Sequence, residues 1–179
     1  MKIGFTGTMS VGKTTLVNAL KELPEFKDYT FRTERSKYLS ELGIPLNTDS
    51  STLGQAVFLA ERASELMQPN VITDRTVIDV MAFSEASKSM GDEDKQAFLQ
   101  YASRLIKEYD IIFYIPPHGI EMEDNGVRET NEQYRTTIDN LIANNLITFK
   151  DDIKDFHTIS GTTWERIDQI KEALFSWYL

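Results

Sequence analysis

Short apolar runs alternate along the chain with longer segments in which apolar residues recur every three or four positions. Five runs rich in β-branched and aromatic residues predict strands at 2–6, 29–33, 71–74, 110–115 and 156–160. The longer segments predict helices at 13–22, 35–42, 52–67, 76–87, 93–108, 130–149 and 162–178. Because strands alternate with helices, the sequence predicts an α/β fold, a three-layer sandwich in which helices cover both faces of a parallel sheet.

Three of the predicted helices carry a recognisable start signal. A threonine is followed three residues later by Gln or Glu at Thr52–Gln55, Thr130–Gln133 and Thr162–Glu165. At this spacing the two side chains can satisfy the unpaired N–H groups of the first helical turn, as a capping box. We therefore expect each of these helices to be capped by its threonine.

The chain has the length and composition of one globular domain, which we place at 1–179. It contains no cysteine, which excludes disulfides and thiolate zinc sites. The longest apolar run, 111–115, is too short to cross a bilayer, and the first predicted strand leaves no room for a signal peptide. We therefore expect a cytoplasmic protein without membrane contact, either a monomer or a homodimer.

The segment between the first predicted strand and the first predicted helix has the spacing G-x-x-x-x-G-K-[ST]. The glycines let the backbone aim its N–H groups at phosphate oxygens, and the helix adds its positive end. The lysine is expected to reach the β- and γ-phosphates, and the following hydroxyl to bind Mg²⁺. The segment thus predicts a nucleoside triphosphate site, with contacts from Gly7, Met9, Ser10, Val11, Gly12, Lys13, Thr14 and Thr15.

Ligands of parallel α/β sheets bind beyond the carboxyl ends of the strands, so polar residues at those ends are candidates for the site. The second strand leads into Arg32, Thr33, Glu34 and Arg35. We expect Glu34 to accept the proton of an acceptor hydroxyl, and Arg32 and Arg35 to bind the substrate or stabilise the transferring charge. The alternative is a surface ion pair between a strand end and a helix start.

The third predicted strand ends in Asp74, followed by Arg75. In a chain with a phosphate loop, an acid at this place is expected to organise Mg²⁺, and the arginine to face phosphate. Asp74 could instead cap the next helix, although Thr76 could take that role. Asp79, one turn further on, is either a second group on the acceptor side or an ordinary helix residue.

The polar segment at about 118–135 combines glycines with Arg128 and Arg135. This combination suits a lid that closes over phosphates, excludes water and supplies the positive charge that phosphoryl transfer requires. The alternative is a solvated acidic loop, because Arg128 is surrounded by the acids Glu121, Glu123, Asp124 and Glu129.

Five features in one order give the sequence a resemblance to a known family: the phosphate loop, Glu34, and the segments 73–79, 123–128 and 160–166. Together they resemble the small P-loop kinases related to the ribosylnicotinamide kinase domain, often described as AAA-domain ATPases, within the wider group of nucleoside and nucleotide kinases. Where such kinases carry Asp-Gly-x-Arg, this sequence has Asn125-Gly126-Val127-Arg128. Arg128 therefore matches the motif, whereas its acidic member does not.

The resemblance implies a P-loop NTPase fold with a five-stranded parallel sheet in the order 2-3-1-4-5 and an arginine-bearing lid. It also implies that 161–166 forms the loop beside the adenine of ATP, with Thr162 and Thr163 as contacts.

These features predict an ATP- and Mg²⁺-dependent kinase that transfers the γ-phosphate to a hydroxyl of a nucleoside-like molecule. A kinase acting on a nucleoside monophosphate, or on nucleic acid at a 5′ end or a hydroxylated base, is the alternative. The carboxylate of Glu34 favours a hydroxyl acceptor, and the net charge of −9 weighs against broad binding of nucleic acid. A P-loop ATPase without transfer is less expected, because 115–117 offers no polar side chain after the fourth strand.

Overall fold

The computed structural model describes residues 1–33, 36–119 and 131–175. Its centre is a five-stranded sheet in the order β2-β3-β1-β4-β5, in which every neighbouring pair is parallel. The predicted α/β fold and the strand order are therefore confirmed. The strands are β1 (Lys2–Thr6), β2 (Thr30–Arg32), β3 (Val71–Thr73), β4 (Ile111–Tyr114) and β5 (Phe156–Thr158).

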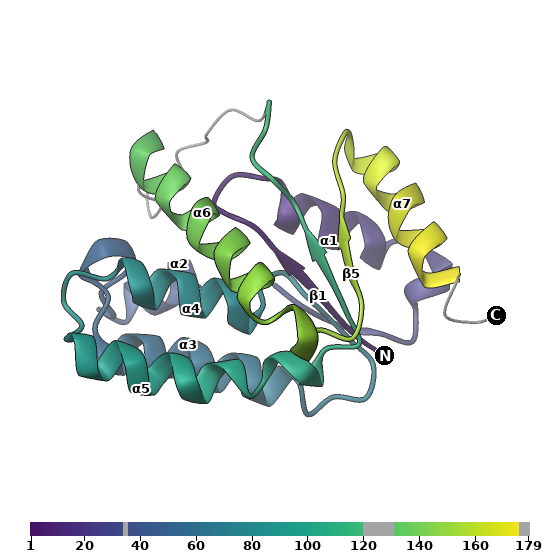
Figure 1. The fold of residues 1–179 in the computed structure, drawn as a ribbon. Helices are drawn as coiled ribbons and strands as arrows, with labels where there is room; N and C mark the ends of the chain where they lie inside the picture. Colours follow the sequence, from purple (N-terminus) through teal and green to yellow (C-terminus); the bar gives the residue numbers. More distant parts are fainter. Residues whose placement is uncertain (34–35, 120–130, 176–179) are drawn as a thin grey trace.

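Helices connect the strands and surround the sheet (Figure 1). The α-helices are α1 (Lys13–Lys21), α2 (Ser36–Glu41), α3 (Thr52–Glu65), α4 (Val77–Ala86), α5 (Asp92–Ser103), α6 (Glu132–Thr148) and α7 (Thr163–Phe175). Single 3₁₀ turns lie at η1 (Pro24–Phe26), η2 (Asn47–Asp49), η3 (Ile106–Glu108) and η4 (Lys150–Asp152).

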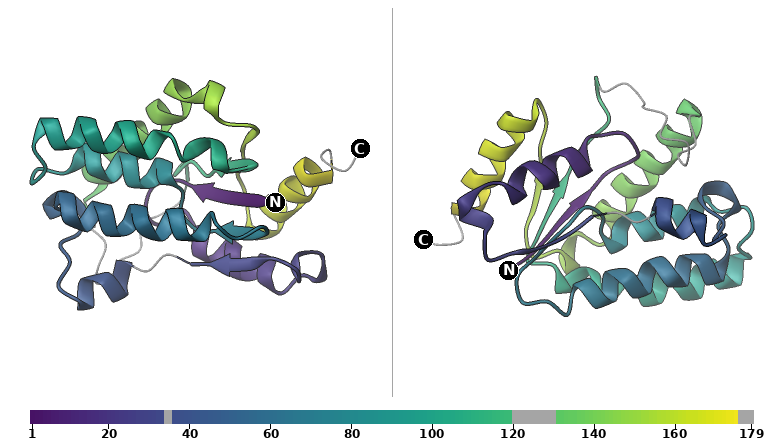
Figure 2. Two further views of the ribbon diagram at one scale, coloured as in Figure 1. Left: turned by 90° about the horizontal axis from the view of Figure 1, so that it is seen from below. Right: turned by 180° about the vertical axis from the view of Figure 1, so that it is seen from behind.

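Two separate apolar cores hold the three layers together. On one face of the sheet, α1 and α7 lie side by side and bury residues such as Leu16 and Ile170 (Figure 2). On the other face, α3, α4 and α6 pack around residues such as Ile78 and Ile138. The helix α4 is buried on nearly all sides because α3, α5 and α6 all contact it. The sheet thus has helices on both faces, as the strand and helix pattern predicts.

Two of the expected helix caps are wrong, and in each the neighbouring residue takes the role. Ser51, not Thr52, caps α3: its extended backbone lets its hydroxyl accept from the N–H of Gly54 at 3.2 Å. The amide oxygen of Asn131 caps α6 by accepting from the N–H groups of Gln133 and Tyr134. A one-residue shift of this kind is decided by the backbone angles of the preceding loop.

The third expected cap is confirmed, since the N–H and hydroxyl of Thr162 both donate to the carboxylate of Glu165. The helix expected at 93–108 is shorter than predicted. It ends at Ser103, and tighter bonds of the 3₁₀ type then turn Ile106 into the core. None of the helices in the described ranges is long and apolar enough to cross a membrane.

Close packing between β1 and the start of α4 depends on a glycine in β1. A Cβ at Gly4 would lie 2.5 Å from the Thr76 methyl and 2.8 Å from the Tyr109 ring. Because Thr76 begins α4, which lies beside the phosphate loop, Gly4 sets how closely that helix approaches the central strand.

We predict that Gly4→Ala destabilises the protein by about 1–3 kcal/mol, because the added methyl overpacks this contact. For a chain of this size the loss corresponds to a drop of roughly 2–12 °C in Tm, measured by thermal unfolding. Gly91→Ala is the matched control, because a Cβ there meets nothing within 4 Å and its φ is −69°. Equal Tm values for Gly4→Ala and the wild type would contradict the packing argument.

Candidate functional site

The path of the loop between β1 and α1 depends on two glycines. Gly7 has a φ of 152°, and a Cβ there would lie 2.5 Å from the carbonyl oxygen of Ile115. Gly12, at the N-cap of α1, has a φ of 83°, which side chains rarely adopt. Both glycines are therefore required by the path of the loop, as the motif spacing indicates.

The side chain of Lys13 lies inside this loop. It is buried, and its ammonium group donates to the carbonyl oxygens of Gly7 at 2.6 Å and Thr8 at 2.7 Å. An ammonium group held over the loop backbone is placed to balance the charge of phosphates bound by the loop N–H groups.

Two apolar side chains of the loop anchor it to the two cores. Met9 packs into the core of α3, α4 and α6, whereas Val11 packs into the core of α1 and α7. Both are almost fully buried, so only their backbone groups are suited to bind phosphate. Thr15, in the first turn of α1, is exposed.

The hydroxyl of Thr14 donates to the carboxylate of Asp74 at 2.5 Å. Asp74 follows β3 and is 1% exposed, and its N–H donates to the carbonyl oxygen of Arg32 at 2.9 Å. The phosphate loop is thereby joined to the carboxyl end of the neighbouring strand. Asp74 does not cap α4, because Thr76 and Asp79 form a complete capping box there.

The pair of Thr14 and Asp74 fits a magnesium site. A hydroxyl and a carboxylate are hard oxygen donors, and Mg²⁺ in such sites is bound by one or two carboxylates together with phosphates and water. Within the described residues no group of three or more His, Cys, Asp or Glu side chains could hold a metal by itself. The chain therefore offers part of a coordination sphere that a bound nucleotide would complete.

Asp79 has a positioning role in this structure. Its carboxylate is fully buried and accepts from the N–H and hydroxyl of Thr76, from the Arg75 guanidinium at 3.3 Å and from the N–H of Gly7 at 3.4 Å. These bonds connect α4 to the first residue of the phosphate loop. Arg75 also lies over the ring of Phe83, 5.1 Å from its centroid.

The structure places Arg135 against the phosphate loop. Its side chain is 3% exposed and donates to the carbonyl oxygen of Met9 at 3.3 Å, while its own carbonyl oxygen accepts from the Thr8 hydroxyl at 3.1 Å. The first turn of α6 therefore supports the loop that would hold the donor phosphates. Arg128, the other arginine of the expected lid, lies outside the described residues.

Arg166 is a loop contact that the motif analysis missed. Its guanidinium donates to the carbonyl oxygen of Val11 at 2.8 Å, and burial lowers its pKa. Arg166 is the last residue of the 160–166 segment that contributes to the family resemblance. Its position in that segment could therefore have marked it as a candidate site residue. The bond brings the start of α7, with Thr162 and Thr163, next to the phosphate loop.

Asp139 is a second residue near the site that the sequence analysis did not name as a candidate. One turn after Arg135 on α6, it accepts from the hydroxyl of Tyr114 at the carboxyl end of β4, at 2.9 Å. Burial raises the pKa of Asp139, while the Tyr114 hydrogen bond and the charges of His118, Arg135 and Lys13 oppose the rise.

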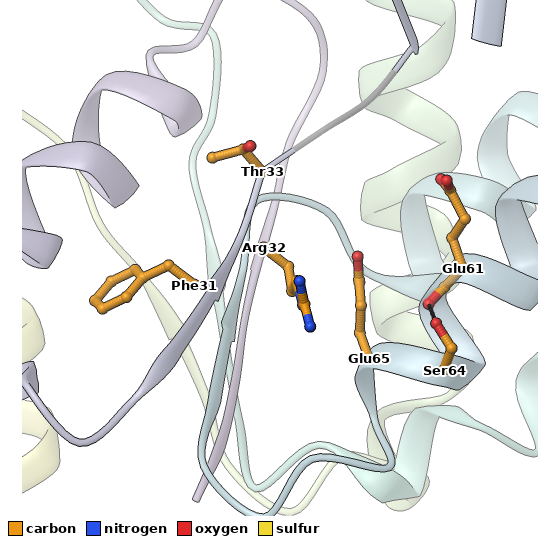
Figure 3. A pocket seen from close by; sticks show the side chains of 6 residues that line it. All are labelled: Phe31, Arg32, Thr33, Glu61, Ser64 and Glu65. Atoms are coloured by element: carbon orange, nitrogen blue, oxygen red, sulfur yellow. Dashed lines mark hydrogen bonds between the residues drawn. The ribbon is translucent and has the colours of Figure 1, made fainter. Parts of the chain in front are cut away.

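The end of β2 forms one wall of a pocket of about 570 Å³, whose other wall is α3 (Figure 3). Arg32 at the end of β2 and Thr33 directly after it line one side, and Glu61, Ser64 and Glu65 line the other side from α3. Glu34 and Arg35, expected on the acceptor side, lie outside the described residues.

Comparisons with known proteins agree with this geometry. Residues 2–166 match the family model described as AAA domain. The structure of deoxyadenosine kinase from M. mycoides with bound dATP has a TM-score of 0.65 at 18% identity, covering 97% of this chain and 98% of that one. The structure of the same kinase with products dCMP and dCDP has a TM-score of 0.65 at 17% identity, covering 98% of this chain and 99% of that one.

NadR in complex with NR has a TM-score of 0.69 at 21% identity, over 89% of this chain and 45% of NadR. The chain thus spans less than half of the length of NadR. No curated protein sequence gives a significant match. At these sequence identities the solved structures establish only the fold. The family model, which matches residues 2–166, establishes the family. The chain belongs to the AAA-domain family and has the fold of the small P-loop kinases.

Proposed function

We propose that this protein is an ATP- and Mg²⁺-dependent kinase that transfers the γ-phosphate to a hydroxyl group of a nucleoside-like small molecule. The observation that carries the proposal is the hydrogen bond between Thr14 and Asp74. It joins a loop suited to hold a triphosphate to a carboxylate suited to hold its metal, at the edge of the sheet where ligands of such folds bind.

The donor would bind along the phosphate loop. The loop N–H groups and Lys13 would hold the β- and γ-phosphates, and Thr14 and Asp74 would hold Mg²⁺, which would offset negative charge on the transferring group. The adenine would lie near Thr162 and Thr163, which Arg166 holds beside the loop. Arg135 is placed to support the loop, and we assign to Arg128 the charge that meets the transferring phosphate.

The acceptor would lie on the side of β2 and β3. In the transfer step an acceptor hydroxyl oxygen forms a bond to the γ-phosphorus, the bond from that phosphorus to the bridging oxygen of ADP breaks, and the hydroxyl proton passes to a carboxylate. We assign this proton transfer to Glu34, and the holding of the acceptor to Arg32, Arg35 and Arg75.

The ligands of the neighbouring structures support a nucleoside-like acceptor and a nucleotide donor. Deoxyadenosine kinase is described with dATP and with dCMP and dCDP, and NadR with NR and with AMP-PNP. Phosphate transfer from γ-labelled ATP should therefore be measured side by side with nucleosides, nicotinamide riboside, nucleoside monophosphates and oligonucleotides. Labelled product from a nucleoside would support the proposal. Transfer only to monophosphates or oligonucleotides, or release of phosphate alone, would contradict it.

We predict that Lys13→Ala reduces transfer by about 10²-fold or more, because it removes a charge aimed at the transferring phosphate. The loss of Tm should be small, since the ammonium group donates to the carbonyl oxygens of Gly7 and Thr8, which belong to its own loop. Lys21→Ala, in the last turn of the same helix, is the matched control. A Lys13→Ala variant with near-wild-type kcat would rule out the phosphate-loop assignment.

We also predict that Glu34→Gln cuts transfer at least tenfold while ATP binding stays intact, because an amide cannot take the hydroxyl proton. Transfer is measured with labelled ATP and binding by calorimetry. Glu41→Gln, at the end of α2, is the control. Unchanged transfer, or an equal loss of ATP binding, would remove Glu34 from the acceptor side.

A further inference from the structure

The pocket between β2 and α3 holds a buried carboxylate with unused hydrogen-bonding capacity. Glu65 is 6% exposed, and its Oε1 accepts from the guanidinium of Arg62 at 2.8 Å. Its Oε2 is buried and accepts no hydrogen bond from the residues in the described ranges. Because an unsatisfied buried carboxylate oxygen is costly, this atom is a strong attachment point for a ligand N–H group.

A guanidinium faces this carboxylate across the pocket. Figure 3 shows Arg32 and Glu65 extending toward each other from β2 and α3, whereas Phe31 points to the other side of the strand. Arg32 is exposed, and its charge acts on Glu65. The pocket therefore presents an acceptor on one wall and a group of fixed donors on the other.

Glu61 places a second carboxylate on the same wall. It lies one helical turn before Glu65 on α3, and its side chain is 18% exposed. Two carboxylates at this spacing can receive both N–H bonds of a single amino group. The hydroxyls of Thr33 and Ser64 complete a lining that is mainly polar.

The pocket adjoins the proposed transfer site. The carbonyl oxygen of Arg32 accepts from the N–H of Asp74, and Thr33 directly follows β2. A molecule held by Arg32 and Glu65 would thus lie beside the strand ends that carry the proposed metal and acceptor groups. The volume of about 570 Å³ is within the range of small-molecule sites.

We propose that this pocket binds the base of the acceptor and selects a nucleoside whose base carries an amino group next to a hydrogen-bond acceptor. The amino N–H bonds go to Glu65 and Glu61, and Arg32 donates to the neighbouring ring nitrogen or carbonyl oxygen. Adenine, cytosine and the carboxamide of nicotinamide have this edge. The inference rests on the proposed kinase function for the identity of the ligand as an acceptor.

Bases with a carbonyl group at the same position are rejected. Hypoxanthine and uracil differ from adenine and cytosine in having an oxygen where the amino group is. That oxygen would face the carboxylates of Glu61 and Glu65 without a hydrogen bond, and a buried polar group left unpaired discriminates strongly. The amino and oxo nucleosides form matched pairs of nearly equal size, so shape alone does not separate them.

The protonation of Glu65 gives a second, independent readout. Burial raises the pKa of Glu65 to about 7; Arg62 and Arg32 oppose the rise, and Glu61 adds to it. The Tyr109 hydroxyl group also faces this cluster and is neutral throughout the range, because burial raises its pKa. Since an N–H group binds an ionised carboxylate more strongly than a protonated one, affinity for amino nucleosides increases as the pH rises from 6 to 8.

The test measures nucleoside binding by calorimetry without ATP, and phosphate transfer separately. The ligands are adenosine with inosine and cytidine with uridine, in ribose and deoxyribose forms, together with nicotinamide riboside. The proteins are the wild type, Glu65→Gln, Arg32→Ala and the control Glu172→Gln on α7. Because Glu65 contacts a buried arginine, Tm is measured for each variant; should Glu65→Gln not fold, the exposed Arg32→Ala decides.

The proposal expects the wild type and the control to bind each amino nucleoside at least tenfold more tightly than its oxo counterpart. Glu65→Gln loses most of this preference and its pH dependence, and Arg32→Ala weakens binding of the amino nucleosides at least fivefold. Equal binding of both members of each pair, or unchanged binding in a folded Glu65→Gln or in Arg32→Ala, overturns it. Selective binding of amino nucleosides without phosphate transfer would support the proposed base-binding pocket and contradict the proposed kinase function. Phosphate transfer without this selectivity would support the kinase function and contradict the proposed role of the pocket.

Discussion

The hydrogen bond between the Thr14 hydroxyl and the Asp74 carboxylate is the constraint on which the site depends. It requires two strands, β1 and β3, to be neighbours, because Asp74 directly follows β3 and Thr14 lies in the helix that the phosphate loop connects to β1. It also requires α1 to begin directly after the loop and α4 to be capped without Asp74, which Thr76 and Asp79 achieve. The parallel sheet in this order satisfies all of these requirements together.

The phosphate loop keeps its shape because every layer of the fold contacts it. Met9 and Val11 insert into opposite cores, and the carbonyl oxygens of the same two residues accept bonds from Arg135 of α6 and Arg166 of α7. Asp79 adds a bond from α4 to the start of the loop. Buried loop carbonyl oxygens need hydrogen-bond donors, and buried arginines are suited to supply them. The loop is therefore preorganised by helices that are distant in sequence.

The parallel sheet and the loop could be predicted from the sequence because they depend on local patterns and a motif with fixed spacing. Asp74 could be placed for the same reason, since it ends an apolar strand. The strand order was implied by the resemblance to the small P-loop kinases. The sequence singled out the segments that hold Arg135 and Arg166, but not their hydrogen bonds to the phosphate loop. Each bond depends on how a helix packs against a loop more than 120 residues away. The pocket residue Glu65 could not be predicted either, because the sequence does not show which strand a residue on α3 will face.

Calorimetric titration of ATP with and without Mg²⁺, in the wild type and in Asp74→Asn, tests the central claim most directly. The amide keeps the size of the side chain and an oxygen for Thr14, but removes the charge that would hold the metal. The account predicts that Mg²⁺ tightens ATP binding at least tenfold in the wild type, that Asp74→Asn loses most of this gain, and that metal-free ATP binds Asp74→Asn at least as tightly as the wild type. The same gain from Mg²⁺ in both proteins would contradict it.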